Sequence, residues 1–379
     1  MPYAPFSIKF MSVLQQAIDT IKLLPTGGPG VCTILITNAC NANCDFCNYA
    51  REKTFVTEHK WIDADKLCEA IDILYDRSVR YLTFVGGEPT LHPRLKDIIA
   101  YATKKGMRST VVTNGSKLTP TLLKELKNSG LKNLSISIDS PSAEKHEKNR
   151  GLPKVWERIK AANEECKRLS IKTAASVTIN KLIGDFRELL AAVKELGFES
   201  VTFAYPKTSS GATTSLSFSE TSLLIDYTPD ELIAALETVK SLKGEFGILN
   251  PGESLTELVR FLKQEKQMYP CYGGYKYFYL DYNFDVYRCD RWPTKMSSIF
   301  DFRDQPFIRD NCTQCMSQCY RDSSVLLHTS VSVGDAIGHL REGKILSAVQ
   351  DIAKPSNFSS LKTLIEDWGT LKKLAKIEK

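Results

Sequence analysis

The sequence lacks a long apolar run, a strong charge of one sign and a recognisable leader. No apolar stretch approaches the roughly 20 residues that a membrane-spanning helix needs. The net charge is only +6 over 379 residues and the lysines are scattered, so nothing indicates nucleic-acid binding. The segment MPYAPFSIKF has no basic part followed by an apolar part, so no secretory signal is predicted. We therefore expect a cytoplasmic protein that does not bind nucleic acid.

Clustered cysteines are the feature that the sequence has in abundance. It contains 11 cysteines, three of them between residues 40 and 47 and five between residues 271 and 319. In a reducing compartment, cysteines this close together indicate metal ligands or catalytic groups before disulfides. The length allows one large domain with an appendage, or two or three ordinary domains.

Short β-branched runs alternate with amphipathic segments between residues 31 and 205. This alternation predicts six strand–helix units, and hence an α/β fold with a parallel sheet and right-handed crossovers. Six units are too few for an eight-stranded barrel, which leaves an open doubly wound sheet and a partial barrel as alternatives. The predicted strands are 32–37, 81–85, 109–113, 133–138, 173–179 and 200–205, and the predicted helices are 63–77, 93–105, 119–129, 153–169 and 183–196.

The ends of the predicted helices carry matching local signals. Asp63 and Thr119 stand where helix N-caps are expected. Gly106, Gly130 and Gly197 stand where the helices should stop, because glycine adopts the left-handed conformation that commonly ends a helix.

The remaining segments suggest a division of the chain into parts. A polar stretch at 207–222 predicts a loop, linker or lid, and helices are predicted at 229–243 and 254–267. The first thirty residues predict an amphipathic helix that packs under the barrel or contacts a membrane surface. Its apolar face would comprise Phe10, Met11, Leu14, Ile18, Ile21 and Leu24. The predicted parts are 1–30 (N-terminal helix), 31–206 (partial barrel), 207–267 (loop and linking helices), 268–325 (second cysteine region) and 326–379 (helical tail).

The first cysteine cluster, Cys40, Cys44 and Cys47, directly follows the first predicted strand. Open α/β sheets bind their ligands at this end of their strands. Three thiolates can hold an iron–sulfur cube but leave one of its irons without a protein ligand, and an open metal position is where a cofactor or substrate binds. The alternatives are buried thiols, a redox pair, or a zinc site completed by His59.

This stretch resembles the C-x3-C-x-Φ-C signature of the radical S-adenosylmethionine (SAM) superfamily, with Phe46 as the aromatic residue. Residues 86–89 are similar to the family's GGEP motif, and polar residues follow the later strands in register. The resemblance covers about residues 31 to 205 and implies a six-stranded partial (β/α) barrel. The residues that it implies in SAM binding are Phe46, Gly86, Gly87, Glu88, Pro89, Asn114, Ser137, Asp139, Asn180 and Tyr205, and a basic pair at Arg150-Gly151 also resembles the family.

The resemblance also implies a chemistry. In this family SAM binds the open iron of a [4Fe-4S] cluster and is reductively cleaved to a 5′-deoxyadenosyl radical, which takes a hydrogen atom from an organic substrate. The cofactor supplies the difficult step, and the protein orients the reactants and excludes water. The expected partners are an organic substrate and an electron donor such as flavodoxin or ferredoxin. No catalytic acid or base is assigned.

The second cysteine region begins with two aromatic-rich alternating runs flanked by Cys271 and Cys289, which predict a β-hairpin. Cys312, Cys315 and Cys319 follow. From the residues alone, an iron–sulfur cluster and a four-cysteine zinc knuckle both remain.

This region resembles the SPASM auxiliary-cluster extension in its shortened twitch form, so the chain is expected to add a small C-terminal domain of a β-hairpin plus helices. The resemblance implies one fully ligated auxiliary [4Fe-4S] cluster held by Cys271, Cys289, Cys312 and Cys315, with Cys319 spare or replacing one of them. Phe284 departs from the family pattern, which usually has glycine at this place in the turn.

The substrate is less defined than the chemistry. The short N-terminal region argues against a peptide-modifying maturase, and the aromatic hairpin favours an apolar substrate such as an isoprenoid lipid or a chlorophyll-type tetrapyrrole. A maturase and a small-alcohol or sugar dehydrogenase remain as alternative enzymes. A non-catalytic iron–sulfur scaffold or sensor is the alternative of another class, but the motif at 86–89 favours an enzyme.

Overall fold

The computed structural model describes residues 21–50, 58–206, 221–315 and 317–367. In these residues ten strands form one sheet, in the order β10-β9-β8-β1-β2-β3-β4-β5-β6-β7. From β8 through β7 neighbouring strands are parallel, and β9 and β10 are antiparallel to their neighbours. The strands are β1 (Gly30–Thr37), β2 (Val79–Gly86), β3 (Arg108–Thr113), β4 (Asn133–Ser137), β5 (Lys172–Thr178), β6 (Ser200–Ala204), β7 (Gly247–Ile248), β8 (Tyr277–Leu280), β9 (Asp285–Tyr287) and β10 (Ser297–Ser298).

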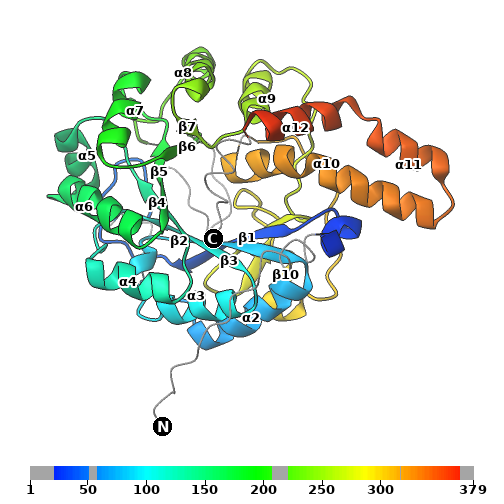
Figure 1. Ribbon diagram of the computed structural model, residues 1–379, viewed down its shortest axis with the longest axis horizontal. Coiled ribbons are helices and arrows are strands. Elements are labelled where there is room, and N and C mark those ends of the chain that lie inside the picture. Colours follow the sequence, from blue (N-terminus) through cyan, green and yellow to red (C-terminus); the bar gives the residue numbers. More distant parts are fainter. Residues whose placement is uncertain (1–20, 51–57, 207–220, 316, 368–379) are drawn as a thin grey trace, which may run out of the picture.

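Helices surround the curved sheet (Figure 1). The predicted alternation of six strands with helices is confirmed, and the sheet does not close, so the fold is a partial barrel. The helix α5 was not predicted, because its polar sequence AEKHEKNR has no apolar periodicity. The helices are α2 (Ala64–Asp76), α3 (Leu95–Lys104), α4 (Pro120–Asn128), α5 (Ala143–Arg150), α6 (Val155–Arg168), α7 (Phe186–Glu195), α8 (Pro229–Ser241), α9 (Gly252–Leu262), α10 (Gln318–Arg341), α11 (Ile345–Ile352) and α12 (Pro355–Glu366).

The predicted helix boundaries are confirmed by their hydrogen bonds and dihedral angles. The Asp63 carboxylate accepts hydrogen bonds from the backbone N–H groups at the start of α2, and the Thr119 hydroxyl caps α4 in the same way. Gly106, Gly130 and Gly197 have φ angles of 82°, 94° and 92°. The local signals in the sequence therefore set the loops that bring the strand ends together.

The two faces of the sheet pack differently. Ile34 and Ile36 of β1 belong to the large core between the sheet and its helices. The residue between them, Leu35, points to the opposite face because side chains alternate along a strand. There it forms a smaller buried cluster with Val85 and three tyrosines, Tyr49, Tyr279 and Tyr287. This cluster lies against Cys47, so the inner face of the partial barrel is aromatic next to the first cysteine loop.

The predicted hairpin is confirmed as β8 and β9, but its position was not anticipated. Strand β8 pairs in parallel with β1, so the hairpin continues the barrel sheet. Its turn places Phe284 at a φ of 65°, the left-handed conformation for which the family pattern has glycine. The Asp281 carboxylate holds this turn by accepting hydrogen bonds from the backbone N–H groups of Asn283 (2.9 Å) and Asp285 (3.0 Å).

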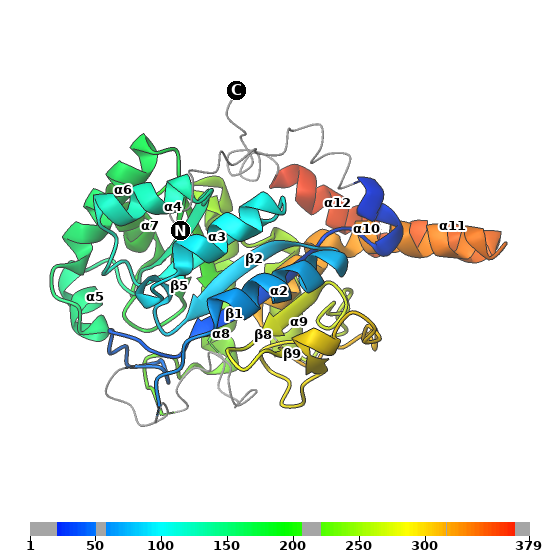
Figure 2. The same cartoon turned by 90° about the horizontal axis from the view of Figure 1, so that it is seen from below.

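The first turn of α10 connects the two sides of the open barrel. The Gln318 side chain donates a hydrogen bond to Thr202 of β6 (3.1 Å), while the Tyr320 ring packs on Tyr277 of β8 with centroids 4.3 Å apart. Beyond this turn, α10 and α11 project from the body of the molecule (Figure 2). Of the earlier predictions, residues 1–20 and the loop at 207–220 lie outside the described residues. Among the helices described, none is long and apolar enough to cross a bilayer.

Candidate functional site

The first cysteine loop leaves the carboxyl end of β1, as predicted. The loop is held by hydrogen bonds from Ala42 N to Cys40 Sγ (3.4 Å) and from Cys47 N to Cys44 O (3.2 Å). Cys40 lies close enough to both Cys44 and Cys47 to interact electrostatically, and in the described residues none of the three forms a disulfide. Burial raises the pKa of Cys40 and of Cys44 to about 12, so both are protonated thiols when no metal is bound. Because metals bind the thiolate form, metal binding would release these protons.

The two glycines of the GGEP motif allow the loop after β2 to touch this cysteine loop. A Cβ atom at Gly86 would lie 2.3 Å from Thr37 O, and one at Gly87 would lie 2.1 Å from Ala39 O. The approach makes two backbone hydrogen bonds, from Gly87 N to Thr37 O and from Glu88 N to Ala39 O, both 2.8 Å. The glycines therefore allow the loop after β2 to pack directly on the backbone at the start of the first cysteine loop.

Glu88 is fully buried and its carboxylate is used within the protein. It accepts hydrogen bonds from the Thr113 hydroxyl (2.7 Å), the Asn114 backbone N–H (2.7 Å) and the Thr90 N–H (3.0 Å). Burial raises the pKa of this carboxyl group, although these donors oppose the rise. Glu88 thus joins the loops after β2 and β3, and Pro89 begins a short 3-10 helix beside it. A direct contact of these residues with SAM remains a prediction.

Asn114 extends the same arrangement to the cysteine loop. Its amide donates a hydrogen bond to Asn41 Oδ1 (2.9 Å), and its own Oδ1 accepts one from Ser116 N (2.9 Å). The Asn41 amide in turn donates to Ser116 Oγ (2.8 Å). The loops after β1, β2 and β3 are therefore connected by buried polar contacts, although they are far apart in the sequence.

Asp139 and Arg150 form a buried ion pair beside the cysteines. Arg150 Nη2 lies 2.6 Å from Asp139 Oδ1, and Asn149 donates to the other carboxylate oxygen at 2.8 Å. Burial alone would raise the pKa of Asp139, but the charge of Arg150 and these hydrogen bonds lower it overall. The Arg150 carbonyl also accepts a hydrogen bond from Asn43 N (2.7 Å), which ties α5 to the cysteine loop.

The charge of Arg150 suits an anionic group held by the cysteines. Its positive charge opposes the rise in pKa at both Cys40 and Cys44. Among the described residues, its Nε is buried without a hydrogen-bond partner. Three thiolates around an iron–sulfur cube carry negative charge, so a buried cation with an unused donor fits such a cluster.

The other predicted SAM-binding residues have different surroundings. Phe46 is buried in the cysteine loop, and Ser137 ends β4 half-buried. The Asn180 amide donates to Asp139 O (2.9 Å) and therefore fixes the backbone beside the ion pair. Tyr205 is fully buried, where it accepts a hydrogen bond from the Asn250 amide (3.0 Å). Its hydroxyl also lies 3.4 Å from Asp322 Oδ1 of α10, and its role in cofactor binding remains a prediction.

The second cysteine group brings four residues together. Cys271 N donates to Cys312 O (2.8 Å), and Cys271 interacts electrostatically with Cys312 and Cys315. Cys289 interacts with Cys271 and Cys315. Cys319 instead lies exposed on the first turn of α10, near Tyr277 and Tyr320. This arrangement favours the set predicted from the resemblance, and iron binding by it remains a prediction.

Within the described part of the chain, no three His, Cys, Asp or Glu side chains converge tightly enough to hold a single metal ion. A structural zinc ion needs its ligands around one point, whereas a cluster binds each thiolate to a different iron. His59, offered as a zinc ligand, is exposed.

The comparisons with known proteins agree with this geometry. Residues 34–196 match the model of the Radical SAM superfamily. An AdoMet-dependent heme synthase of Methanosarcina barkeri is 30% identical over 173 residues, which cover 45% of this chain and 49% of that protein. An Fe-coproporphyrin III synthase of the same organism is 32% identical over 146 residues, covering 38% and 36%. This chain thus spans half or less of the length of these relatives.

A solved structure shows the same fold. The crystal structure of Streptococcus suis SuiB bound to S-adenosylmethionine aligns with a TM-score of 0.56 at 17% identity, covering 77% of this chain and 69% of that one. Radical SAM proteins use a [4Fe-4S] cluster and SAM, and the first cysteine loop with its buried Arg150 fits that requirement. The region around this loop, residues 34–196, is therefore a radical SAM domain.

Proposed function

We propose that this chain is a radical SAM enzyme whose open cluster is held by Cys40, Cys44 and Cys47. The observation that carries the proposal is the position of these thiols beside buried Arg150, inside a domain that matches the family. When bound, the cluster and SAM supply a one-electron cleavage that gives methionine and a 5′-deoxyadenosyl radical. The chain's own residues hold the loops around the site, with buried Glu88 and Asp139 bonded to neighbouring loops and to Arg150.

The proposed substrate is a tetrapyrrole with a planar apolar macrocycle, of which a C–H bond is oxidised or functionalised. Two relatives of the barrel domain are named for heme and Fe-coproporphyrin III synthesis. On the inner face of this barrel, the buried cluster around Tyr279 and Tyr287 lies next to Cys47. Flat aromatic rings pack well against a planar macrocycle. An isoprenoid lipid is the second apolar candidate, and a peptide substrate would contradict this part of the proposal.

The second cysteine group is proposed to hold a closed auxiliary [4Fe-4S] cluster. The candidate ligands Cys271, Cys289, Cys312 and Cys315 suffice for all four irons of a cube. Such a cluster has no open position and would serve in electron transfer or in positioning the substrate.

The test uses anaerobically reconstituted protein with dithionite and SAM. We expect 5′-deoxyadenosine to form, and its yield to increase with Fe-coproporphyrin III but not with a mixed peptide library. The variant Cys40→Ala/Cys44→Ala/Cys47→Ala should form none. The matched control Cys68→Ala changes a half-buried cysteine of α2 and should behave as the unmodified protein. A yield no greater than that of the triple variant would rule out the radical SAM reaction and leave the scaffold alternative.

A further inference from the structure

Arg321, on the first turn of α10, is one of the largest fully buried side chains among the described residues, with 2% of its surface exposed. Its Nη2 donates a hydrogen bond to Gln267 Oε1 (2.5 Å) and lies 3.5 Å from Glu257 Oε2. Its Nη1 is also buried, and within the described residues no group accepts a hydrogen bond from it. A buried guanidinium group with an unused donor is costly, so a missing anionic partner would explain it.

Glu257 does not satisfy this charge by itself. Its Oε2 already accepts hydrogen bonds from the backbone N–H groups of Met268 (2.8 Å) and Tyr269 (3.2 Å), and its Oε1 accepts one from Arg260 (2.6 Å). One buried carboxylate thus serves two arginines and two backbone donors. The side of Arg321 that carries Nη1 is left without a counter-charge among these residues.

The cysteine group lies close enough to Arg321 to interact with it electrostatically. The positive charge of Arg321 opposes the effect of burial, which raises the pKa of Cys271 to about 11. Gln267 ties the two regions together, because its amide nitrogen donates to Thr313 O (3.1 Å) in the loop between Cys312 and Cys315. Arg321 is therefore held near the cysteines by its contact with Glu257 of α9 and, through Gln267, by the cysteine loop.

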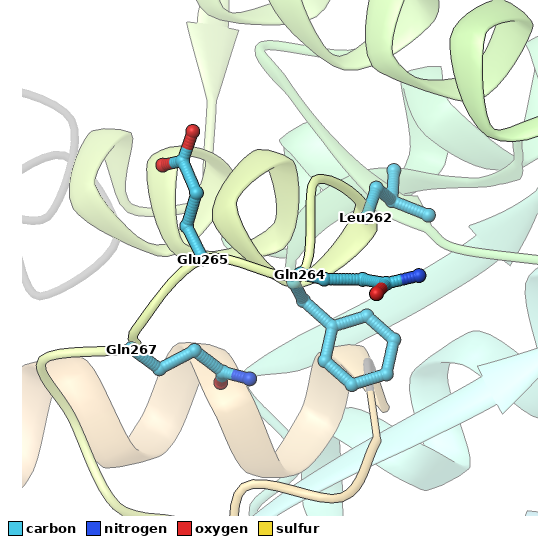
Figure 3. Close-up of a pocket in the computed structure, with 5 residues that line it drawn as sticks. Leu262, Gln264, Glu265 and Gln267 are labelled. Carbon is cyan, nitrogen blue, oxygen red and sulfur yellow. The ribbon is translucent and has the colours of Figure 1, made fainter.

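A pocket of about 470 Å³ opens on the outer side of this contact. Its lining includes Gln264, Glu265 and Gln267 (Figure 3). The Glu265 carboxylate is directed away from the two glutamine amides in this view. Gln267 thus stands between the pocket and buried Arg321, and the pocket supplies no described anion to Nη1.

A second buried arginine provides the comparison. Arg288 also lies near the group and interacts with Cys289 and Cys312. Both of its terminal nitrogens bind the Asp310 carboxylate, at 2.6 and 2.8 Å, so it is a paired cation. Arg321 has a longer ion-pair contact, with Glu257, a hydrogen bond to the neutral Gln267 amide, and an unused donor.

We propose that Arg321 is a positioning residue for the auxiliary cluster, whose positive charge and unused donor stabilise the reduced form of that cluster. This inference rests on the proposed function, because it requires a cluster at Cys271, Cys289, Cys312 and Cys315. Reduction adds one electron to the cluster and breaks no bond, so it increases the negative charge next to Arg321. A neighbouring cation favours that state and raises the reduction potential.

The experiment measures the potential of the auxiliary cluster in the Cys40→Ala/Cys44→Ala/Cys47→Ala protein, where no other cluster contributes to the signal. Iron content is determined first, and an electron paramagnetic resonance redox titration follows. In this background Arg321→Gln should lower the ratio of reduced to oxidised cluster at a fixed potential by about tenfold. For one electron, this corresponds to a reduction potential about 59 mV lower. Arg321→Lys should retain most of the wild-type ratio. Glu257→Gln should raise the ratio, because it removes the opposing charge.

The control is Arg303→Gln, which breaks an exposed ion pair with Asp76 and should leave the ratio unchanged. A wild-type ratio in an iron-loaded Arg321→Gln protein would overturn the inference. If that variant does not retain iron, Glu257→Gln decides, and an unchanged or lowered ratio there would also overturn it. Absence of iron, or the presence of zinc, in the background protein would instead contradict the auxiliary cluster itself.

Discussion

The carboxylate of Glu88 lies 2.7 Å from the backbone nitrogen of Asn114 and joins the loops that follow β2 and β3. Glu88→Gln would place an amide N–H group among these donors or leave one of them unsatisfied. We expect it to lower the free energy of unfolding by about 1–3 kcal/mol, measured by urea denaturation. Glu125→Gln, at an exposed ion pair with Lys96, should change it by less than about 1 kcal/mol. Equal effects of the two substitutions would contradict the role given to Glu88.

Gly87→Ala should disrupt the first cysteine loop. Its Cβ would lie 2.1 Å from Ala39 O, a backbone atom that can move away only with the loop. We expect reconstituted protein to lose about four irons per chain, since only the first site is affected. Gly338→Ala is the matched control, because nothing lies within 4 Å of its Cβ and alanine favours a helix. Full iron loading of Gly87→Ala would contradict this interpretation.

Breaking the buried Asp139–Arg150 ion pair should lower the stability of the protein much more than breaking an exposed ion pair. Arg150→Met leaves a buried carboxylate without its cation, which costs about 3–5 kcal/mol of stability. Arg94→Met breaks the pairs with Asp65 and Asp97 at the surface and should cost less than about 1 kcal/mol. Thermal unfolding of the two variants checks the difference. A tolerated Arg150→Met would mean that Asp139 takes up a proton or finds another partner.

At Phe284, replacement by glycine should give a more stable protein than replacement by alanine, which reverses the usual order of stability. At a φ of 65°, alanine keeps the backbone strain of an L-residue while glycine removes it. We expect Phe284→Gly to be more stable than Phe284→Ala by about 1 kcal/mol, although both lose the packing of the ring. At Phe302, which is buried with an ordinary φ of −75°, alanine should be the more stable replacement. The same order at both positions would exclude strain at Phe284.

The buried carboxyl group of Asp322 predicts a pH dependence of stability. Burial raises its pKa to about 6, above the ordinary value of 3.8. The folded protein therefore holds this proton more tightly than the unfolded chain, and the resulting stability is lost as the pH rises from about 4 to above 6. Compared with Asp322→Asn, the wild type should lose about 2–3 kcal/mol over this range. Parallel curves of the two proteins in urea titrations at each pH would contradict the shift.

Much of the barrel could be predicted because its signals are local. Alternating strands and helices, the caps at Asp63 and Thr119, and the terminal glycines each depend on a few neighbouring residues. The spacing of Cys40, Cys44 and Cys47 likewise lies within one loop. The contacts of Glu88 were harder to predict, because its motif was assigned to ligand binding whereas its carboxylate bonds the next loop.

The features that the sequence did not predict arise from contacts between distant residues. Tyr205 follows β6 like a ligand-binding residue, but Asp322, which lies 117 positions away, meets it in a buried network. Helix α5 has no apolar stripe, and it is fixed instead by the Ser142 cap and by buried Arg150. Local patterns in the sequence do not reveal these contacts. Their prediction would require information on which distant segments lie side by side.

The pairing of β1 with β8 has a consequence for synthesis of the chain. Thr33 and Tyr277, whose hydroxyl oxygens are 2.7 Å apart, are separated by 244 positions. One edge of β1 therefore stays unpaired on the ribosome until β8 has been made, although the cysteine loop that follows β1 is already complete. Late pairing of this kind slows folding and leaves a strand edge open to aggregation. The nascent chain thus carries three thiols beside an unprotected strand edge until β8 is available for pairing.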